Sequence, residues 1–243
     1  MNAERARANG GVAVSGLVAL LPMKAHSERV PDKNFRPLAG RPLYRWMLDT
    51  LLSLPEVERV VINTDARPQL ATAGLKEGPR VQIRDRAPAL CGDLVSMNRI
   101  IENDIAHVPA QTYLMTHTTN PLLSAATIRV AMGRFQAALA DDSGDSLFSV
   151  NRIQTRLYRA DGSAVNHDPA QLTRTQDLDP WFEENSCLYL FSAASFAVTG
   201  ARIGRRPVMF VTPRWQSVDI DDAEDWALAE ALSGQQTRGA EHA

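Results

Sequence analysis

The alternation of strand-like and helix-like segments is the feature that most restricts how this chain can fold. Short apolar and β-branched runs, typical of buried strands, alternate with segments that carry apolar residues at helical spacing. The predicted strands span residues 16–21, 57–65, 81–86, 112–119, 146–153, 186–191 and 206–212, and the predicted helices span 42–54, 94–108, 124–139 and 222–232. Connections of this length favour right-handed crossovers and a mostly parallel sheet with helices on both faces. The sequence therefore predicts an α/β fold.

The segment 124–139 has the clearest helical pattern. Ile128, Met132, Phe135 and Leu139 recur at helical spacing and would form one apolar face against the sheet. Ser124 directly precedes this pattern, and its hydroxyl is suited to accept a hydrogen bond from the first turn. We therefore expect an amphipathic helix with Ser124 as its N-cap.

The alternation is interrupted between residues 155 and 185. This segment is polar and rich in turn-forming residues, and Asp161-Gly162 favours a tight hairpin turn. We expect residues 155–185 to leave the main sheet as an inserted arm that serves as a lid, a dimer contact, or both. The chain shows no internal repeat and no low-complexity linker, so we predict one domain over residues 1–243, with 1–14 as a disordered tail.

Composition and charge exclude several classes of function. The net charge of −2 gives no reason to expect nucleic acid or an anionic membrane surface as a partner. No apolar run approaches the roughly 18 residues of a membrane span, and no small-x-small cleavage site follows the N-terminal apolar run. The two cysteines, Cys91 and Cys187, lie far apart in sequence and suggest no disulfide framework, which favours a reducing cytoplasm. The sequence also lacks a P-loop, a GxGxxG motif, a GxSxG elbow and histidines at zinc spacing.

The loop after the first predicted strand carries a high density of positive charge. Lys24, Arg29, Lys33 and Arg36 lie among prolines, directly after the apolar run. Open α/β folds bind ligands at the carboxyl edge of the sheet, where this loop would lie. Lysine as a mobile point charge and arginine as a bidentate fork together suit a polyphosphate. A set of solvated surface charges is the alternative explanation for the same residues.

An acidic run near the C-terminus supplies the opposite charge. In an extended segment, Asp219 and Asp221 would project from one face while Ile220 turns to the core. Two carboxylates on one face are typical of a partial shell for Mg²⁺, which takes further oxygens from water and substrate phosphates. Asp222 is placed to cap the following helix, with Asp225 three residues on. The alternative to a metal site is that Asp219 and Asp221 are a solvated acidic pair.

Five segments together carry a resemblance to a known family. In chain order they are LPMKAHSERVPDKNFRPLAGRPL (21–43), RAPALCGDLVSM (86–97), THTTNPL (116–122), TRTQDLDPWFEENSCLYLF (173–191) and SVDIDDAEDW (217–226). They resemble, in the same order, the motifs of the acylneuraminate cytidylyltransferase family, which makes CMP-activated sialic and related nonulosonic acids. The resemblance covers nearly the whole chain. It implies a Rossmann-like fold of the nucleotide-diphospho-sugar transferase type, with an inserted dimerisation arm.

The resemblance also implies a reaction and a set of site residues. CTP would donate its cytidylyl group to a 2-keto sugar acid with Mg²⁺ as cofactor, in a homodimer whose arms reach toward each other's sites. The implied residues are Arg29 and Lys33 for catalysis, Lys24, Ser27, Asn34, Arg86, Asp93 and Ser96 for the nucleotide, His117, Asn120, Arg174 and Gln176 for the acceptor, and Asp219 and Asp221 for the metal.

Several positions depart from the family pattern and leave the acceptor open. Lys24 stands where the family usually has arginine, and Ala25 and His26 stand in its glycine-rich turn. Glu28 stands where a lysine is frequent, and His117 where the sialic acid branch has glutamine. One alternative is a nucleotidyltransferase of the same fold that acts on a Kdo-type acid or a phosphonate. The other alternative is a non-catalytic nucleotide-binding homologue.

Overall fold

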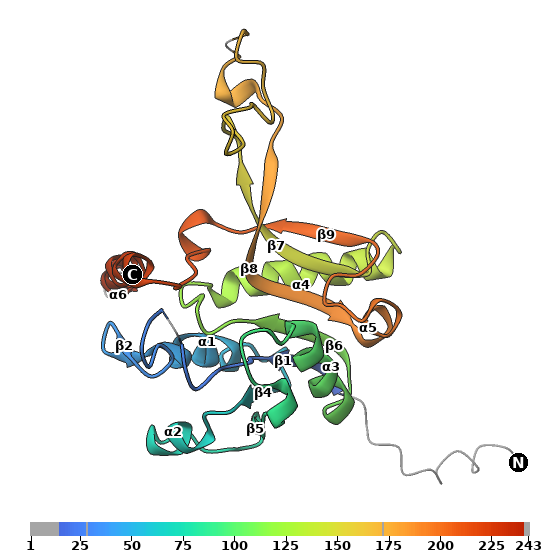
Figure 1. The fold of residues 1–243 in the computed structure, drawn as a ribbon. Coiled ribbons are helices and arrows are strands. Elements are labelled where there is room, and N and C mark those ends of the chain that lie inside the picture. The colour runs from blue at the N-terminus through green and yellow to red at the C-terminus, as the bar shows by residue number, and fades with distance from the viewer. Residues whose placement is uncertain (1–14, 28, 172, 241–243) are drawn as a thin grey trace, which may run out of the picture.

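A seven-stranded sheet forms the centre of the molecule in the computed structural model, which describes residues 15–27, 29–171 and 173–240 (Figure 1). In their order across the sheet, the strands are β5 (Val81–Asp85), β4 (Arg59–Thr64), β1 (Ser15–Leu20), β6 (Ala110–Thr116), β8 (Trp181–Ser192), β7 (Ser146–Ile153) and β9 (Pro207–Val211). The predicted strands are thus all present. The predicted tail, residues 1–14, lies outside the described residues.

The sheet is mostly parallel, as predicted, but β8 runs against both of its neighbours. The pairs β4–β5, β1–β4, β1–β6 and β7–β9 are parallel, whereas β8 is antiparallel to β6 and to β7. The reason is that the chain leaves β7 into the arm and returns from it directly as β8. A connection that returns at the same end of the sheet joins antiparallel strands, and no crossover helix intervenes.

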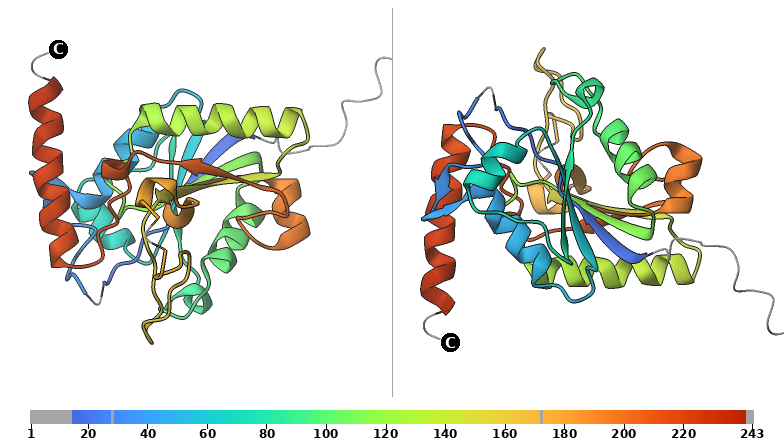
Figure 2. Two further views of the ribbon diagram at one scale, coloured as in Figure 1. Left: turned by 90° about the horizontal axis from the view of Figure 1, so that it is seen from above. Right: turned by 90° about the horizontal axis from the view of Figure 1, so that it is seen from below.

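Helices cover both faces of the sheet, as predicted (Figure 2). They are α1 (Leu43–Leu52), α2 (Arg67–Thr72), α3 (Met97–His107), α4 (Ala125–Ala140), α5 (Ala193–Thr199) and α6 (Ala223–Ala240). Strand β1 shows how alternation serves both layers. Ala19 packs in a core cluster with side chains of α1, α2 and α4, whereas Val18 and Leu20 pack in a second cluster with α3 and α5. None of the described helices is long and apolar enough to cross a membrane.

Helix α4 confirms most of its predicted pattern. Ser124 accepts a hydrogen bond from the backbone N–H of Thr127, which satisfies one free donor of the first turn. Ile128, Met132 and Phe135 are buried against the sheet, but the prediction for Leu139 is wrong, because its side chain is 38% exposed. In the last turn the buried side chain is that of Ala138 instead. The backbone carbonyl of Ala138 accepts a hydrogen bond from the N–H of Gly144, where the chain turns toward β7.

Several short elements have no counterpart in the predicted pattern. They are α2, α5, the hairpin of β2 (Pro37–Leu38) with β3 (Arg41–Pro42), and the 3₁₀ helices η1 (Pro88–Leu90), η2 (Thr175–Asp177) and η3 (Arg214–Gln216). The β2–β3 turn is Ala39-Gly40, with φ values of 46° and 80°. Two positive φ angles are typical of the tight turn that matches strand twist. This hairpin directs the cationic loop back into α1.

The arm projects from the β7–β8 ribbon, away from the helical layers (Figure 1). Its predicted turn at Asp161-Gly162 is present: Gly162 has a φ of 83° and donates its N–H to the carbonyl of Arg159. The predicted start of the following strand at residue 186 is wrong, however. Strand β8 begins at Trp181, which pairs with Ile153, so residues 181–185 form part of the ribbon that carries the arm.

Candidate active site

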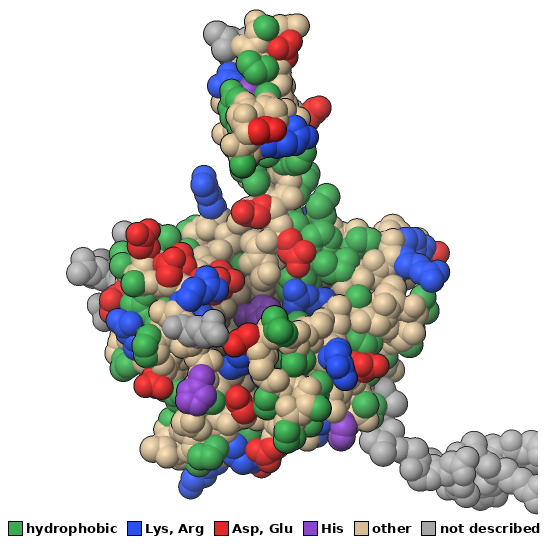
Figure 3. Space-filling view, viewed as in Figure 1, with side chains coloured by type: hydrophobic (Ala, Val, Ile, Leu, Met, Phe, Trp, Pro, Cys, Tyr) green, Lys and Arg blue, Asp and Glu red, His purple; other side chains and the backbone are tan. Residues whose placement is uncertain are grey.

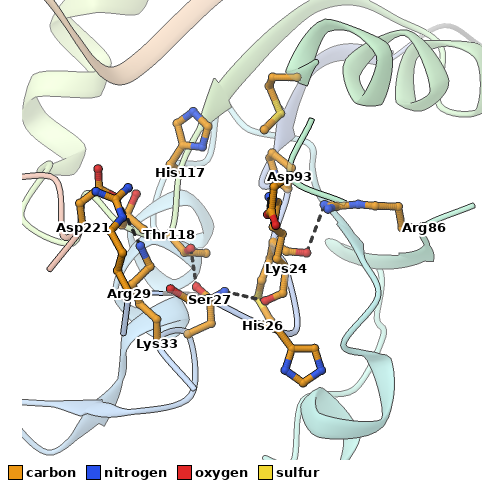
Figure 4. A pocket seen from close by; sticks show the side chains of 15 residues that line it. Lys24, His26, Ser27, Arg29, Lys33, Arg86, Asp93, His117, Thr118 and Asp221 are labelled. Carbon is orange, nitrogen blue, oxygen red and sulfur yellow. Dashed lines mark hydrogen bonds and ion pairs between the residues drawn. The ribbon is translucent and has the colours of Figure 1, made fainter. Parts of the chain in front are cut away.

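A cavity of about 400 Å³ opens at the carboxyl ends of β1, β5 and β6 (Figure 4). The strand order reverses at β1, because β4 and β5 follow on one side and β6 lies on the other. Ligands of open α/β sheets bind at such a switch point. The lining residues are Pro22, Met23, Lys24, His26, Ser27, Arg29, Lys33, Asn34, Arg86, Asp93, Met97, His117, Thr118, Thr119 and Asp221.

Most of the residues that the sequence predicted for a site line this one cavity. They are Lys24, Ser27, Arg29, Lys33, Asn34, Arg86, Asp93, His117 and Asp221. Sequence reasoning missed His26, Met97, Thr118 and Thr119. The two threonines could have been found, since they follow His117 directly after a strand that ends at the same edge. Met97 begins α3, and nothing in the sequence pattern indicated that it would face the cavity.

The cations of the first loop meet the acidic run at Asp221. Lys33 Nζ donates to the carbonyl oxygen of Ile220 at 2.7 Å and lies 3.5 Å from Asp221 Oδ1. Arg29 Nη2 lies 3.1 Å from the same carboxylate oxygen. Lys33 is only 12% exposed, whereas Arg29 is 65% exposed. Lys33 and Ile220 are 187 positions apart in sequence, so the tertiary fold joins two charged segments into one cluster.

A second ion pair crosses between two loops at the cavity. Lys24 Nζ lies 2.7 Å from Asp93 Oδ1, and both side chains are well exposed. An exposed pair of this kind contributes about 0–1 kcal/mol to stability. The pair joins the loop after β5 to the loop after β1. Glu28, another departure from the family pattern in this loop, lies outside the described residues.

Asn34 fixes the shape of the cationic loop. Its Nδ2 donates to the carbonyl oxygen of Lys24 at 2.8 Å, and its Oδ1 accepts from the Thr118 hydroxyl at 2.6 Å. Ser27 acts locally, accepting the N–H of Val30 on its hydroxyl at 3.4 Å. The side chain of Asn34 is buried, so both ends of its amide are used within the protein. The loop is thereby held against the end of β6.

Arg86 is buried in the cavity wall and bonded to the ends of β1 and β4. Its Nε donates to Asn63 Oδ1 at 2.9 Å, and its Nη2 donates to the carbonyl oxygens of Met23 and Asn63 at 3.1 and 2.8 Å. Asn63 in turn donates to the buried carboxylate of Asp104 on α3 at 2.7 Å. Burial lowers the pKa of Arg86, while nearby acids including Asp65 and Asp104 act in the opposite direction. This network makes Arg86 a fixed part of the wall.

Asp219 has the character of a cation ligand. Its Oδ1 is buried and has no hydrogen-bond partner among the described residues. Burial raises the pKa of this carboxyl, a hydrogen bond with the Thr119 side chain lowers it, and the charge of Asp221 raises it again. Ile220 between them is fully buried, as predicted, and its N–H donates to the carbonyl of Thr119. A buried acceptor without a partner calls for an explanation such as a bound ion, and Asp219 and Asp221 together fit a partial Mg²⁺ shell.

The described residues contain no cluster of three or more histidine, cysteine, aspartate or glutamate side chains suited to a metal. Any shell here would therefore rest on two carboxylates and on oxygens from water or substrate, which is typical of Mg²⁺. Asp222 serves helix α6 instead. It accepts the N–H groups of Glu224 and Asp225 at 2.9 and 3.0 Å, as its predicted capping role requires.

The remaining predicted site residues, Asp219 included, do not line the cavity. Ser96 is the N-cap residue of α3, without a side-chain cap bond. Asn120 is fully buried, and its Nδ2 donates to the carbonyl of Val218 at 3.4 Å. Arg174 and Gln176 lie on the arm, where Arg174 pairs with Asp177 at 2.6 Å. The arm projects beyond the sheet (Figure 1), and neither residue is among those that line the cavity, so their role at the acceptor stays a prediction.

His117 carries a neutral imidazole in the cavity. Burial lowers the pKa of His117 to about 4, and the charges of Arg202 and Lys33 lower it further, while Asp221 acts in the opposite direction. The side chain is therefore uncharged near pH 7. In this state it can accept a proton on one ring nitrogen and donate a hydrogen bond from the other.

The lowered pKa of His117 has a measurable consequence for stability. Between pH 6.5 and about pH 4, the unfolded chain binds a proton at His117 that the folded chain does not bind. The free energy of unfolding should therefore fall as the pH drops through this range. His117→Gln removes the titrating group and should lose less stability between pH 7.5 and pH 5. Urea denaturation of both proteins at the two pH values measures this, and equal losses would contradict the assignment.

Comparison with known proteins identifies the fold and the family. A family model described as "Cytidylyltransferase" matches residues 18–236. The chain belongs to the cytidylyltransferase family. The family assignment makes it an enzyme of nucleotidyl transfer, and it confirms the general class that the sequence motifs indicated.

Individual relatives are distant but cover most of this cytidylyltransferase-family chain. The CMP-N,N'-diacetyllegionaminic acid synthase of Legionella pneumophila is 27% identical over 231 residues, which cover 89% of this chain and 95% of the relative. The pseudaminic acid cytidylyltransferase of Campylobacter jejuni is 22% identical over 227 residues, covering 88% and 95%. A solved CMP:2-keto-3-deoxy-manno-octonic acid synthetase in complex with CTP superposes with a TM-score of 0.61 at 14% identity, covering 91% of this chain and 100% of that one. The last similarity shows a shared fold.

Proposed function

We propose that the protein transfers the cytidylyl group of CTP to a nonulosonic acid, a 2-keto sugar acid of the sialic, legionaminic or pseudaminic type. The convergence of Arg29 and Lys33 on Asp221, beside Asp219, is the observation that carries this proposal. The names of the two relatives support the acceptor class, and the CTP complex of the similar structure supports the donor. The proposed compartment is the cytoplasm, in keeping with Cys91 and Cys187, which are both free thiols.

In the proposed reaction, the anomeric hydroxyl oxygen of the acid bonds to the α-phosphorus of CTP. The bond from this phosphorus to the bridging oxygen breaks, and pyrophosphate leaves. Lys33 and Arg29 would leave their ion pairs with Asp221 and bind phosphate oxygens of CTP. There they would neutralise the negative charge that develops on the leaving pyrophosphate. The hydroxyl proton would leave to solvent, and the neutral imidazole of His117 can accept a hydrogen bond from the attacking hydroxyl, since its lowered pKa makes it a weak base. Asn34 holds the cationic loop in place, so the protein contributes mainly position and charge.

Asp219 and Asp221 would hold the Mg²⁺ ion of this reaction. Once bound, the ion would neutralise charge on the phosphates and polarise the α-phosphoryl group. The buried oxygen of Asp219 without a partner supports this assignment. Asp221 pairs with Arg29 and Lys33. If these cations bound the triphosphate instead, the carboxylate of Asp221 would be available to hold the metal.

A homodimer formed through the arms is part of the same proposal. Hydrophobic side chains gather on the surface at the base of the arm (Figure 3). Trp181 and Phe182 of β8 and Met209 and Val211 of the edge strand β9 are each at least 40% exposed. Exposed large apolar side chains in one region are typical of a protein interface. In such a dimer, Arg174 and Gln176 of one arm would reach the acceptor in the cavity of the partner.

Pyrophosphate release from CTP and GTP with a panel of sugar acids tests the proposed function. The panel contains sialic, legionaminic and pseudaminic acids, a Kdo-type acid and a phosphonate. We expect turnover with CTP and a nonulosonic acid, and at least about 100-fold lower kcat/KM with GTP, because a purine does not fit a pocket formed for a pyrimidine. Comparable turnover of CTP and GTP would contradict the proposal. Activity with the phosphonate alone would reassign the acceptor, and CTP binding without turnover would indicate a non-catalytic homologue.

A further inference from the structure

Arg202, which no sequence pattern indicated, lies beside the cavity in the loop between α5 and β9. Its Nη2 donates to the Tyr189 hydroxyl at 2.9 Å, and its guanidinium carbon lies 3.8 Å from the centre of the Tyr189 ring. Nη1 contacts the sulfur of Met115 at 3.6 Å, and the backbone N–H donates to Asn98 Oδ1 of α3 at 3.3 Å. Elements β6, β8 and α3 therefore fix the position of this guanidinium.

The contact with Met115 places Arg202 next to His117. Met115 is near the end of β6, and His117 follows two residues later, directly after the last residue of the strand, Thr116. The positive charge of Arg202 contributes to the lowered pKa of His117, after the larger effect of burial. Met97, the neighbour of Asn98 on α3, lines the cavity together with His117. Arg202 itself does not line the cavity. It lies next to the lining residues Met97 and His117, on the side of α3 and α5.

The charge of Arg202 is only loosely compensated within the chain. Its side chain is 19% exposed, and the ion pair that the described residues provide is with Glu184, at 3.6 Å. The Glu184 carboxylate is itself bound by the Tyr189 hydroxyl. The firmest partner of the guanidinium is thus a neutral hydroxyl group, at 2.9 Å. A guanidinium carries five N–H donors, so donors remain for a bidentate anion.

We propose that Arg202 binds the carboxylate of the sugar-acid acceptor, with Tyr189 and Glu184 holding its guanidinium in place. This inference rests on the proposed function. The phosphates of CTP would occupy Lys33 and Arg29, so the acceptor carboxylate needs another cation. That carboxylate is bonded to the anomeric carbon whose hydroxyl must attack, so its binding residue must lie close to the reacting centre. Arg202 beside His117 meets this requirement within one chain, and it leaves Arg174 of the partner's arm for more distant groups of the acceptor.

The experiment compares Arg202→Met with a matched control, Arg205→Met. Arg205 lies in the same loop, is exposed, and contacts Asp145 through its backbone N–H. The probes are the best nonulosonic acid of the panel and its methyl ester, which lacks the carboxylate charge. For Arg202→Met we expect an acceptor KM at least about 30-fold above that of the wild type, with the Kd of CTP within about twofold, since one charged hydrogen-bonded contact is lost. Arg205→Met should leave both constants unchanged.

The methyl ester separates a binding role from a structural one. The wild type should favour the acid over the ester strongly, and Arg202→Met should favour it at least about 10-fold less. A variant that is only destabilised would keep the wild-type preference, and this outcome would overturn the inference. If Arg202→Met does not fold, Arg202→Lys serves instead, because it keeps the charge but not the fork. Its acceptor KM should rise about 5- to 10-fold, and an unchanged KM would overturn the inference.

The inference and the proposed function can fail separately. A wild type that releases no pyrophosphate with any nonulosonic acid would overturn both. A wild type that is active, together with an Arg202→Met variant that keeps its acceptor KM and its preference for the acid, would overturn the inference alone. The proposed function would then stand without a carboxylate-binding role for Arg202.

Discussion

Asp219→Asn and Asp221→Asn are each expected to lower the Mg²⁺-dependent turnover of CTP by at least about 100-fold, because two carboxylates supply most of the protein's part of the metal shell. The fold should persist in both variants, since asparagine has the same shape. Asp221→Asn has a second consequence. It removes the carboxylate that pairs with Arg29 and Lys33, so the affinity for CTP without metal should not fall. Steady-state kinetics across Mg²⁺ concentrations, with calorimetric titration of CTP, measure both effects.

Asp222→Asn is the matched control for the two metal variants. Asp222 belongs to the same acidic run, but its carboxylate caps α6. Asparagine caps a helix about as well as aspartate, so this variant should keep near wild-type turnover and Mg²⁺ dependence. Turnover near the wild-type level in both Asp219→Asn and Asp221→Asn would contradict the metal assignment. Equal losses in all three variants would instead indicate that the acidic run acts through its total charge.

Lys33→Ala is the second change with a large expected effect. Its ammonium group is nearly buried, 3.5 Å from Asp221 and beside the cavity. If it neutralises charge on the leaving pyrophosphate, its removal should lower kcat for CTP by about 100- to 1,000-fold, as the loss of one aimed donor does in other sites. Pre-steady-state measurement of pyrophosphate release reports the chemical step directly. The thermal melting curve of the variant shows whether the lost hydrogen bond to Ile220 has damaged the fold.

Arg36→Ala separates the role of position from that of charge. Arg36 belongs to the same cationic loop, but its guanidinium lies 4.4 Å from the centre of the Trp226 ring, outside the cavity lining. Its loss should cost about 0.5–1 kcal/mol of stability through this cation–π contact and leave turnover nearly unchanged. Wild-type kinetics in Lys33→Ala would mean that the loop cations are solvated surface charges. Equal damage from both substitutions would show that the loop acts through net charge.

Some of the predicted site residues make contacts within the protein that the resemblance did not imply. Asn34 and Arg86 were expected at the nucleotide, and both line the cavity. Their hydrogen bonds, however, go largely to the protein: Asn34 to Lys24 and Thr118, and Arg86 to Asn63. Side chains that are fixed in this way shape a site before any ligand enters it. The direct contact of either one with CTP stays a prediction.

Sequence alone determined the elements that place the site. Strand and helix periods, which depend on the burial of each side chain, predicted every strand of the sheet and the inward turn of Ile220 between two aspartates. The charged loop after β1 could be placed at the carboxyl edge because strand direction follows from crossover connections. These properties are local, since each depends on neighbours within a few residues along the chain.

Only the tertiary structure decided which of these residues meet. Lys33 and Asp221 share a cluster because the segment after β9 returns to the end of β6, where Ile220 bonds to Thr119. Arg202 stands beside His117 because β8 runs antiparallel between β6 and β7 and brings Tyr189 opposite Met115. Such contacts depend on the order and direction of strands across the sheet. A side-chain period specifies which face of a strand is buried but not which strand lies next to it, so the sequence pattern could not reveal these partners.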